Sequence, residues 1–140
     1  METLDHERLE VYQLSLAAIA AAHEVLSTVP RGHANLTDQL YRAVMSIPLN
    51  IAEGAGEHRP LEKARFYRIA RRSATEASAA LDVLACLRLT DRRAIRNAKV
   101  LLARIVAMLV RLAQAMDQPG RGTRKRTRTR TAAAPRKAQR

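Results

Sequence analysis

The amino-acid sequence predicts an all-α protein, folded as an up-and-down antiparallel four-helix bundle over residues 7–117. Apolar residues recur at intervals of three and four in four successive segments, which is the spacing of amphipathic helices. Short stretches rich in glycine, proline or threonine separate the segments, and no stretch alternates in the manner of a strand. A bundle of about 110 residues can fold around one core without disulfide staples. Helices joined by short links pack antiparallel.

The first helix is expected from Glu7 to Leu26, with Asp5 as its N-cap residue. It is apolar on two sides, since no charged residue occurs between Val11 and Ala22. One face consists of Leu9, Tyr12, Leu16, Ile19, Ala20 and His23, and the other of Val11, Leu14, Ala18, Ala21 and Val25. A helix of this kind is normally covered on both sides. In so small a chain, we expect the second cover to be another subunit.

The second helix is expected to begin near Asn35 or Thr37, because either side chain could cap it. It should end at Gly54 to Gly56, since glycine takes the left-handed conformation common at helix C-termini. Its apolar face consists of Leu36, Leu40, Val44, Ile47 and Ile51. A polar stripe lies beside that face and consists of Gln39, Arg42, Ser46, Asn50 and Glu53.

The third helix is expected to begin at Pro60, where the missing N–H of proline costs nothing. Its core face, rich in small residues that allow close helix packing, is Phe66, Ala70, Ser73, Ala77, Ala80, Leu84 and Leu87. Thr90 and Asp91 should cap the fourth helix, which runs to about Met116. Its apolar face is Ile95, Ala98, Leu102, Ile105, Val106, Leu109, Leu112 and Met116. Residues 118–140 lack apolar periodicity and are predicted to be a disordered, arginine-rich tail.

Three segments carry a resemblance to a known family: L-E-V-Y-Q at residues 9–13, the run at 39–56, and F-Y-R-I-A-R-R-S-A-T-E at 66–76. They resemble the bacterial four-helix-bundle proteins encoded in intervening sequences of large-subunit ribosomal RNA genes, relatives of the retroelement accessory variability protein. The resemblance extends from Leu9 to Met116, and S-I-P-L-N-I-A-E-G at 46–54 is its most specific part. It implies a protomer that assembles into a homo-oligomeric ring, a pentamer in some members, with nucleic acid as the suspected partner and no catalysis. Arg72 departs from the family, which usually has a small residue there.

The charge of the chain is concentrated at its C-terminus. Of the net +12, the segment after Gln118 supplies nine Lys or Arg and no acid, whereas residues 1–118 hold sixteen basic and thirteen acidic residues. Outward basic faces that could contact phosphates are formed by Arg65, Arg68, Arg72, Arg93, Arg96, Arg104 and Arg111. The candidate contacts in the tail are Arg121, Arg124, Lys125, Arg126, Arg128 and Arg130. The alternatives are a solvated arginine surface offset by nearby acids, a solubilising extension, and an arginine-rich genome composition.

The polar stripe of the second helix is a further candidate site. Buried polar atoms without partners cost about 1–3 kcal/mol each, so these side chains need partners such as Glu76 or Arg72. We expect a structural polar network that fixes helix or subunit register, made of Gln39, Arg42, Ser46, Asn50, Glu53 and Glu76. A phosphate-contacting surface and an enzymatic pocket are the alternatives.

Several functional classes have no support in the sequence. Cys86 is the single cysteine, so an intramolecular disulfide is impossible and a reducing compartment fits. The acidic N-terminus is unlike a signal peptide, and no apolar run approaches the ~20 residues of a membrane span. His33 and His58 are interpreted as solvated loop residues, and no metal or cofactor motif occurs.

We therefore expect a non-enzymatic, homo-oligomeric cytoplasmic protein that binds nucleic acid, RNA or an RNA-containing complex, through basic helix faces and a basic tail. The alternative is an oligomeric adaptor for a protein partner such as a reverse transcriptase. A third hypothesis is a helical enzyme acting on a small anionic metabolite, for which Gln39, Arg42, Glu53 and Arg68 are suitable residue types.

Overall fold

The computed structural model of the chain describes residues 1–118. They form a short 3-10 helix, η1 (Asp5–Arg8), and four α-helices: α1 (Glu10–Ser27), α2 (Ala34–Gly56), α3 (Pro60–Cys86) and α4 (Arg92–Asp117). The predicted disordered tail lies outside the described residues after Gln118. So do its candidate contacts Arg121, Arg124, Lys125, Arg126, Arg128 and Arg130.

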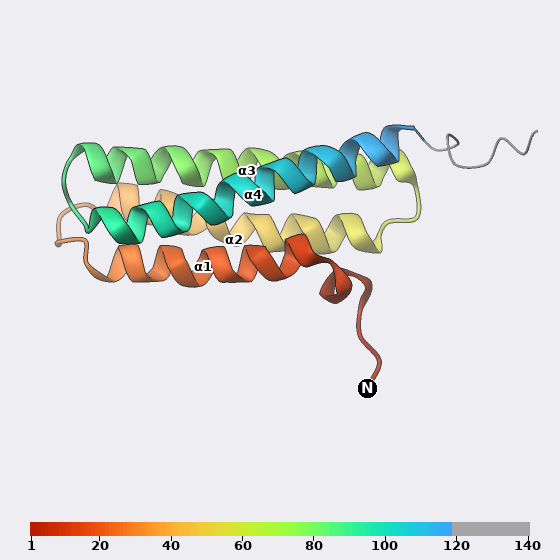
Figure 1. Ribbon diagram of the computed structural model, residues 1–140, viewed down its shortest axis with the longest axis horizontal. Coiled ribbons are helices and arrows are strands. Elements are labelled where there is room, and N and C mark those ends of the chain that lie inside the picture. The colour runs from red at the N-terminus through yellow and green to blue at the C-terminus, as the bar shows by residue number, and fades with distance from the viewer. Residues whose placement is uncertain (119–140) are drawn as a thin grey trace, which may run out of the picture.

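The four helices run alternately up and down, with the α1–α2 and α3–α4 turns at one end of the bundle and the α2–α3 turn at the other (Figure 1). Each helix packs against two neighbours, in the cyclic order α1, α2, α3, α4. Within residues 1–118 no strand is present. The predicted all-α class and its four helices are confirmed, and the ring of subunits stays a prediction.

The core between the helices is built from aliphatic side chains and alanine. Its largest fully buried side chains are Leu40, Ile47, Ile51, Leu81, Leu84, Leu102, Ile105 and Leu109. Along α3, Ala70, Ala74 and Ala77 are also fully buried, and these small residues let the neighbouring helices approach closely. The apolar faces predicted for the second and fourth helices therefore point into the core as expected.

The N-terminus of α1 differs from the prediction. Asp5 belongs to η1 and does not cap α1, which begins only at Glu10 after the extended residue Leu9. The η1 turn is closed instead by Glu7, whose Oε2 accepts a hydrogen bond from the backbone N–H of Leu4 at 2.6 Å. The break at Leu9 separates the four-residue η1 from the 18-residue α1, where the sequence pattern suggested one helix.

The predicted end of α2 at Gly56 is confirmed, whereas its predicted start and its left-handed glycine need correction. The helix begins at Ala34, and the Thr37 hydroxyl donates to the carbonyl of Ala34 at 3.1 Å, so it does not cap N–H groups. Asn35 makes no cap either, because the N-cap position is His33. Among the described residues Gly32 is the only glycine with a positive φ, so neither glycine of the E-G-A-G run is left-handed.

The C-terminus of α2 is satisfied by a side chain from α3. Lys63 Nζ donates to the carbonyl oxygens of Gly54 at 3.1 Å and Ala55 at 2.8 Å. A cation at this position also complements the negative end of the helix dipole. The last turn of α2 is thus stabilised from outside, without a glycine cap.

Gly54 has a different role, which is close packing against α3. A Cβ at this position would lie 2.8 Å from Cε1 of the Tyr67 ring and 3.1 Å from the Cβ of Phe66. Tyr67 is only 4% exposed and occupies the core position for which the sequence suggested Phe66, which is partly exposed. Burial raises the pKa of the Tyr67 phenol above its ordinary value.

The turn between α3 and α4 was predicted with two errors. Thr90 does not cap α4, because its hydroxyl donates to the carbonyl of Val25 at 3.3 Å. Asp91 is confirmed as the N-cap of α4, since its carboxylate accepts from the backbone N–H groups of Arg93 at 3.2 Å and Ala94 at 3.4 Å. Pro60 is likewise confirmed as the first residue of α3. Leu87 lies beyond the end of α3 and is 54% exposed, so it is not part of the core face.

Candidate nucleic-acid interface

The inner part of the predicted polar stripe forms a hydrogen-bonded contact between α2 and α3. The hydroxyl oxygens of Ser46 and Ser73 lie 2.8 Å apart, and Asn50 Nδ2 donates to the Ser46 carbonyl at 2.8 Å. Ser73, which was predicted only as a small core residue, is buried and also donates to the carbonyl of Ile69 at 3.1 Å. These bonds satisfy the polar atoms and help to fix the register of α2 against α3.

The outer part of the stripe faces solvent. Gln39 Nε2 donates to Glu76 Oε1 at 3.4 Å. Arg42 and Glu53 are exposed and have no hydrogen bond or ion pair from their side chains within residues 1–118. Gln39, Arg42 and Glu76 line a surface hollow of about 350 Å³ together with two polar residues of the first turns of α2. The stripe therefore divides into a buried contact and an exposed polar surface.

Two of the three arginines predicted on the basic face of α3 have acidic partners. Arg65 Nε lies 3.1 Å from Glu62 Oε2, and its guanidinium stands 4.5 Å over the centre of the Phe66 ring. Arg68 forms an ion pair with Asp117 at the end of α4. Arg72 is exposed and without an ion pair in the described part of the chain. Exposed pairs of this kind are worth about 0–1 kcal/mol, but each offsets a cation that a phosphate would otherwise meet.

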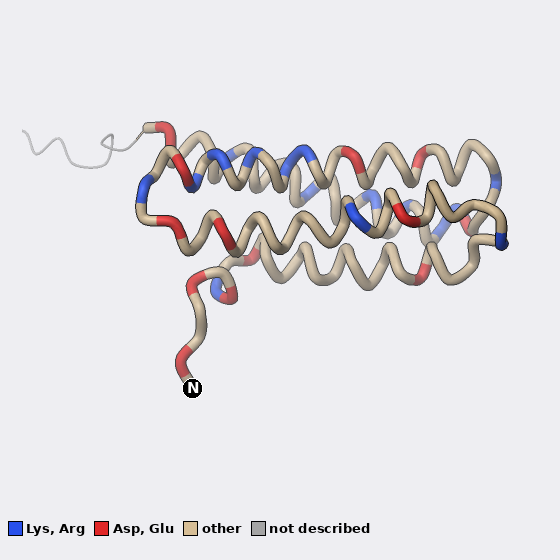
Figure 2. The backbone as a smooth tube through the Cα atoms, turned by 180° about the vertical axis from the view of Figure 1, so that it is seen from behind, with Lys and Arg blue, Asp and Glu red and all other residues tan. Residues whose placement is uncertain are grey.

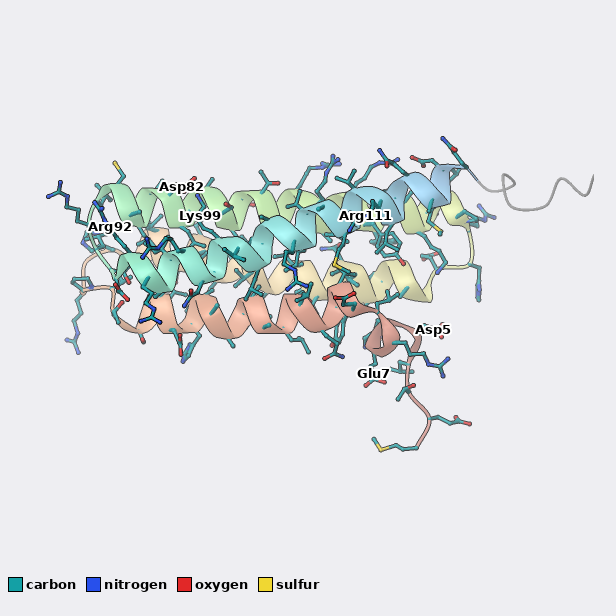
Figure 3. All side chains as sticks on the ribbon, in the orientation of Figure 1. Asp5, Glu7, Asp82, Arg92, Lys99 and Arg111 are labelled. Carbon is teal, nitrogen blue, oxygen red and sulfur yellow. The ribbon has the colours of Figure 1, made fainter. Side chains whose placement is uncertain are left out.

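The arginines of α4 are divided in the same way. Arg104 Nη2 lies 3.6 Å from Glu10 Oε1 of α1. Arg93, Arg96 and Arg111 are exposed and form no ion pair with any residue up to Gln118. Figure 3 shows Arg111 toward the C-terminal half of α4, away from the helix N-terminus that carries the other two.

Two cations that were not predicted from the sequence as contacts, Arg92 and Lys99, lie beside Arg96. Arg92, Arg96 and Lys99 follow one another at intervals of four and three along α4 and line a surface hollow of about 500 Å³. The same spacing that identified the apolar faces could have found them, because residues so spaced share one face of a helix.

An apolar surface made of Leu16, Met45 and Leu49 lies on the outside of α1 and α2. His23 Nδ1 and Tyr41 Oη are 2.8 Å apart, and this contact fixes the antiparallel register of the two helices. In this register Leu16, which precedes His23 by seven residues, lies opposite the segment from Met45 to Leu49. Leu16 is 41%, Met45 51% and Leu49 63% exposed. Figure 2 shows that a long part of α1 contains no charged residue.

His33 and His58 lie in the two turns that flank α2. His33 and His23 line a hollow of about 400 Å³ at the α1–α2 turn, and His58 is exposed in the α2–α3 turn. Within residues 1–118 no group of three or more His, Cys, Asp or Glu side chains could hold a metal ion. Among the described helices none has the length and apolarity to cross a membrane.

The residue types considered for an enzymatic site do not converge. Gln39 and Arg42 share the hollow beside Glu76, whereas Arg68 pairs with Asp117 of α4 and Glu53 is exposed near the end of α2. The side chains that distinguish this protein lie on its outer surfaces, as arginines on α3 and α4 and as apolar residues on α1 and α2. They belong to an all-helical bundle protein whose outer surface carries both charged and apolar side chains.

The particular family follows from comparison with known proteins. Residues 7–111 match the family described as 23S rRNA-intervening sequence protein, and because this match covers most of the 140 residues, the chain belongs to that family. The resemblance seen in the sequence is therefore confirmed. No curated protein matches the chain.

Proposed function

We propose that the protein is a non-enzymatic, homo-oligomeric nucleic-acid-binding protein of the cytoplasm, and that its partner is RNA or an RNA-containing complex. The observation that carries the proposal is the excess of cations without acidic partners on the outer surface, joined to a tail segment with nine Lys or Arg and no acid. The description of the family, which refers to ribosomal RNA, favours RNA over other polyanions.

The physical basis is the release of counterions from the phosphate backbone. Each phosphate neutralised by Lys or Arg releases about 0.7 counterion from a single strand and 0.9 from a duplex. Binding of this kind weakens steeply as salt rises and has little sequence preference. Repetition of one weakly basic surface around an oligomer would multiply the number of such contacts.

The proposed oligomer would form through the apolar surface of α1 and α2. Leu16, Met45 and Leu49 are exposed in the single chain. Burial of apolar area contributes roughly 25 cal/mol per Å², and contiguous exposed apolar surface commonly marks an interface. A second copy of the chain is the proposed cover, because α1 has no charged residue between Val11 and Ala22.

The test is the solution mass of the full-length protein and of a truncated form ending at Gln118, each measured with and without a single-stranded RNA at low and at moderate salt. The proposal predicts an oligomer for both forms, and RNA binding by the full-length protein that weakens as salt is raised. Circular dichroism should show equal helix content in the two forms. A full-length protein that ignores RNA even at low salt would refute the nucleic-acid function.

A protein adaptor is the second candidate, because the same apolar surface could receive a different protein. The adaptor function predicts that removal of residues 119–140 leaves partner binding intact, whereas the nucleic-acid function predicts a large loss of RNA affinity. Retention of full RNA affinity without the tail would place all contacts on the bundle.

A further inference from the structure

The α3–α4 turn and the first turns of α4 carry an excess of positive charge. Residues 82–99 contain five cations, Arg88, Arg92, Arg93, Arg96 and Lys99, against two carboxylates, Asp82 and Asp91. Residues 1–118 as a whole hold sixteen cations and thirteen carboxylates, so the remainder has eleven of each. Acidic residues gather at the opposite end of the bundle, around the N-terminal segment and the C-terminus of α2 (Figure 2). The α3–α4 turn and the first turns of α4 thus carry an excess of +3. Residues 59–72 also hold six cations against one carboxylate, but Lys63, Arg65 and Arg68 there are engaged by the α2 carbonyls, Glu62 and Asp117.

This stretch also contains a hollow that a phosphate group can enter. The hollow of about 500 Å³ is lined by Arg92, Arg96 and Lys99 from α4 and by Asp82 and Cys86 from α3. Lys99 and Asp82 form an ion pair with each other, whereas Arg92 and Arg96 form none within residues 1–118. Figure 3 shows Asp82, Arg92 and Lys99 together at this end of the bundle. Two guanidinium groups are therefore available beside a neutralised pair.

The cations of this turn occupy positions that do not favour the fold. Arg88 has a φ of 55°, a left-handed backbone conformation in which glycine is less strained. Arg92 and Arg93 occupy the first turn of α4, where the helix dipole favours acids and disfavours cations. Departures from local preference are expected at functional sites, and here they fall in a stretch that carries an excess of positive charge.

We infer that the hollow between the end of α3 and the start of α4 binds the phosphodiester backbone of nucleic acid, with Arg92 and Arg96 as the principal contacts. This inference rests on the proposed function and locates it on the bundle. No aromatic side chain lines the hollow, so bases have no stacking platform and the backbone is what is recognised. Arg31 lies on the neighbouring α1–α2 turn, which is joined to this one by Thr28 and Thr90, whose hydroxyl oxygens are 2.5 Å apart.

The first experiment compares two charge-matched double variants of the full-length chain, Arg92→Gln with Arg96→Gln, and Arg8→Gln with Arg59→Gln. The control pair is exposed and lies at the other end of the bundle. The 27 residues of α3 span roughly 40 Å, several times the ~10 Å Debye length at 0.1 M salt. Affinity for single-stranded oligo(U) RNA and for oligo(dT) DNA is measured over a range of salt concentrations.

Loss of two phosphate contacts should reduce the slope of log affinity against log salt by about 1.4. If the variant and the wild type bind equally at 1 M salt, the variant should bind about 25-fold more weakly at 0.1 M salt. The control pair should change affinity by less than about threefold. The inference would be overturned if both double variants lost RNA affinity equally, or if neither lost any. Either result would still leave RNA binding by the protein established. A preference for RNA over DNA above about tenfold would also overturn it, because the shared backbone would not be what is read.

Cys86 provides a second readout that does not depend on charge. It is the only cysteine of the chain, it is exposed, and it lines the hollow. Saturating oligo(U) should slow alkylation of Cys86 by N-ethylmaleimide in the wild-type protein and in the control pair. An unchanged alkylation rate in protein that demonstrably binds RNA would exclude this hollow. Failure of the wild-type protein to bind any RNA would instead refute the proposed function, and the location with it.

Discussion

Replacement of Gly54 by alanine tests how α2 and α3 are held together. The added Cβ would lie 2.8 Å from Cε1 and 3.0 Å from Cδ1 of the Tyr67 ring, and 3.1 Å from the Cβ of Phe66. Carbon atoms in ordinary contact are about 3.5–4.0 Å apart, so something must move. The ring cannot easily do so, since Tyr67 is 4% exposed, and the Cβ of Phe66 is fixed to the α3 backbone.

The expected magnitude is a balance of two effects. Overpacking a close helix contact costs about 1–3 kcal/mol, and alanine gains about 0.5–1 kcal/mol over glycine inside a helix. The free energy of unfolding should therefore fall by about 1–2 kcal/mol. For a domain of this size, the melting temperature should drop by roughly 4–8 °C.

The assay is urea and thermal unfolding followed by circular dichroism at one fixed protein concentration, because oligomer stability depends on concentration. Gly56→Ala is the matched control, since a Cβ there meets nothing within 4 Å, and it should leave stability unchanged or raise it by about 0.5 kcal/mol. In a Tyr67→Leu background the cost of Gly54→Ala should shrink, because the ring that the Cβ meets is gone. If Gly54→Ala is as stable as the wild type, the packing argument is wrong.

Four further outcomes are expected. Lys63→Met should lower the free energy of unfolding by about 0.5–1.5 kcal/mol, because the Gly54 and Ala55 carbonyls lose their donor. Asp91→Ala should cost about 1 kcal/mol in urea unfolding, whereas Asp91→Asn, which keeps a capping oxygen, should cost less. The raised pKa of Tyr67 contributes stability that is complete below pH 10.0 and lost as pH rises through the folded-state pKa, so Tyr67→Phe should flatten the alkaline fall in stability. By sedimentation, Leu49→Glu should shift the proposed oligomer toward monomer, whereas Val100→Glu, at a similarly exposed position on α4, should not.

Much of the fold could be predicted from local patterns. Leu40, Ile47 and Ile51 are buried because residues three and four apart on a helix share one face, and this spacing of apolar residues can be read directly from the sequence. Asp91 and Pro60 mark helix starts through their own backbone chemistry, which needs no distant partner. Predictions failed where one local pattern is compatible with more than one structure. Asp5 belongs to the separate turn η1 and does not cap α1, and the glycines at the end of α2 do not adopt the left-handed conformation.

The candidate site was predicted less completely, because the availability of a charge depends on residues far away in the chain. The sequence identified Arg68, Arg96 and Arg104 alike as outward cations. Arg68 meets Asp117 and Arg104 meets Glu10, 49 and 94 positions away, whereas Arg96 meets no acid in the described part of the chain. Only the packing of α4 against α1 and α3 decides which arginines are offset.

The sequence by itself therefore determined the number of helices, the inward faces of α2 and α4, and the family, since all three follow from periodicity and local motifs. It could not decide between the two apolar sides of α1, because both satisfy the same periodicity. The tertiary structure buries Val11, Ala18 and Val25 in the core and leaves Leu16 on the outside. It also packs Gly54 against the Tyr67 ring and leaves Arg92 and Arg96 without an ion pair within residues 1–118. Each of these depends on which surfaces meet, and that is fixed only when the four helices pack together.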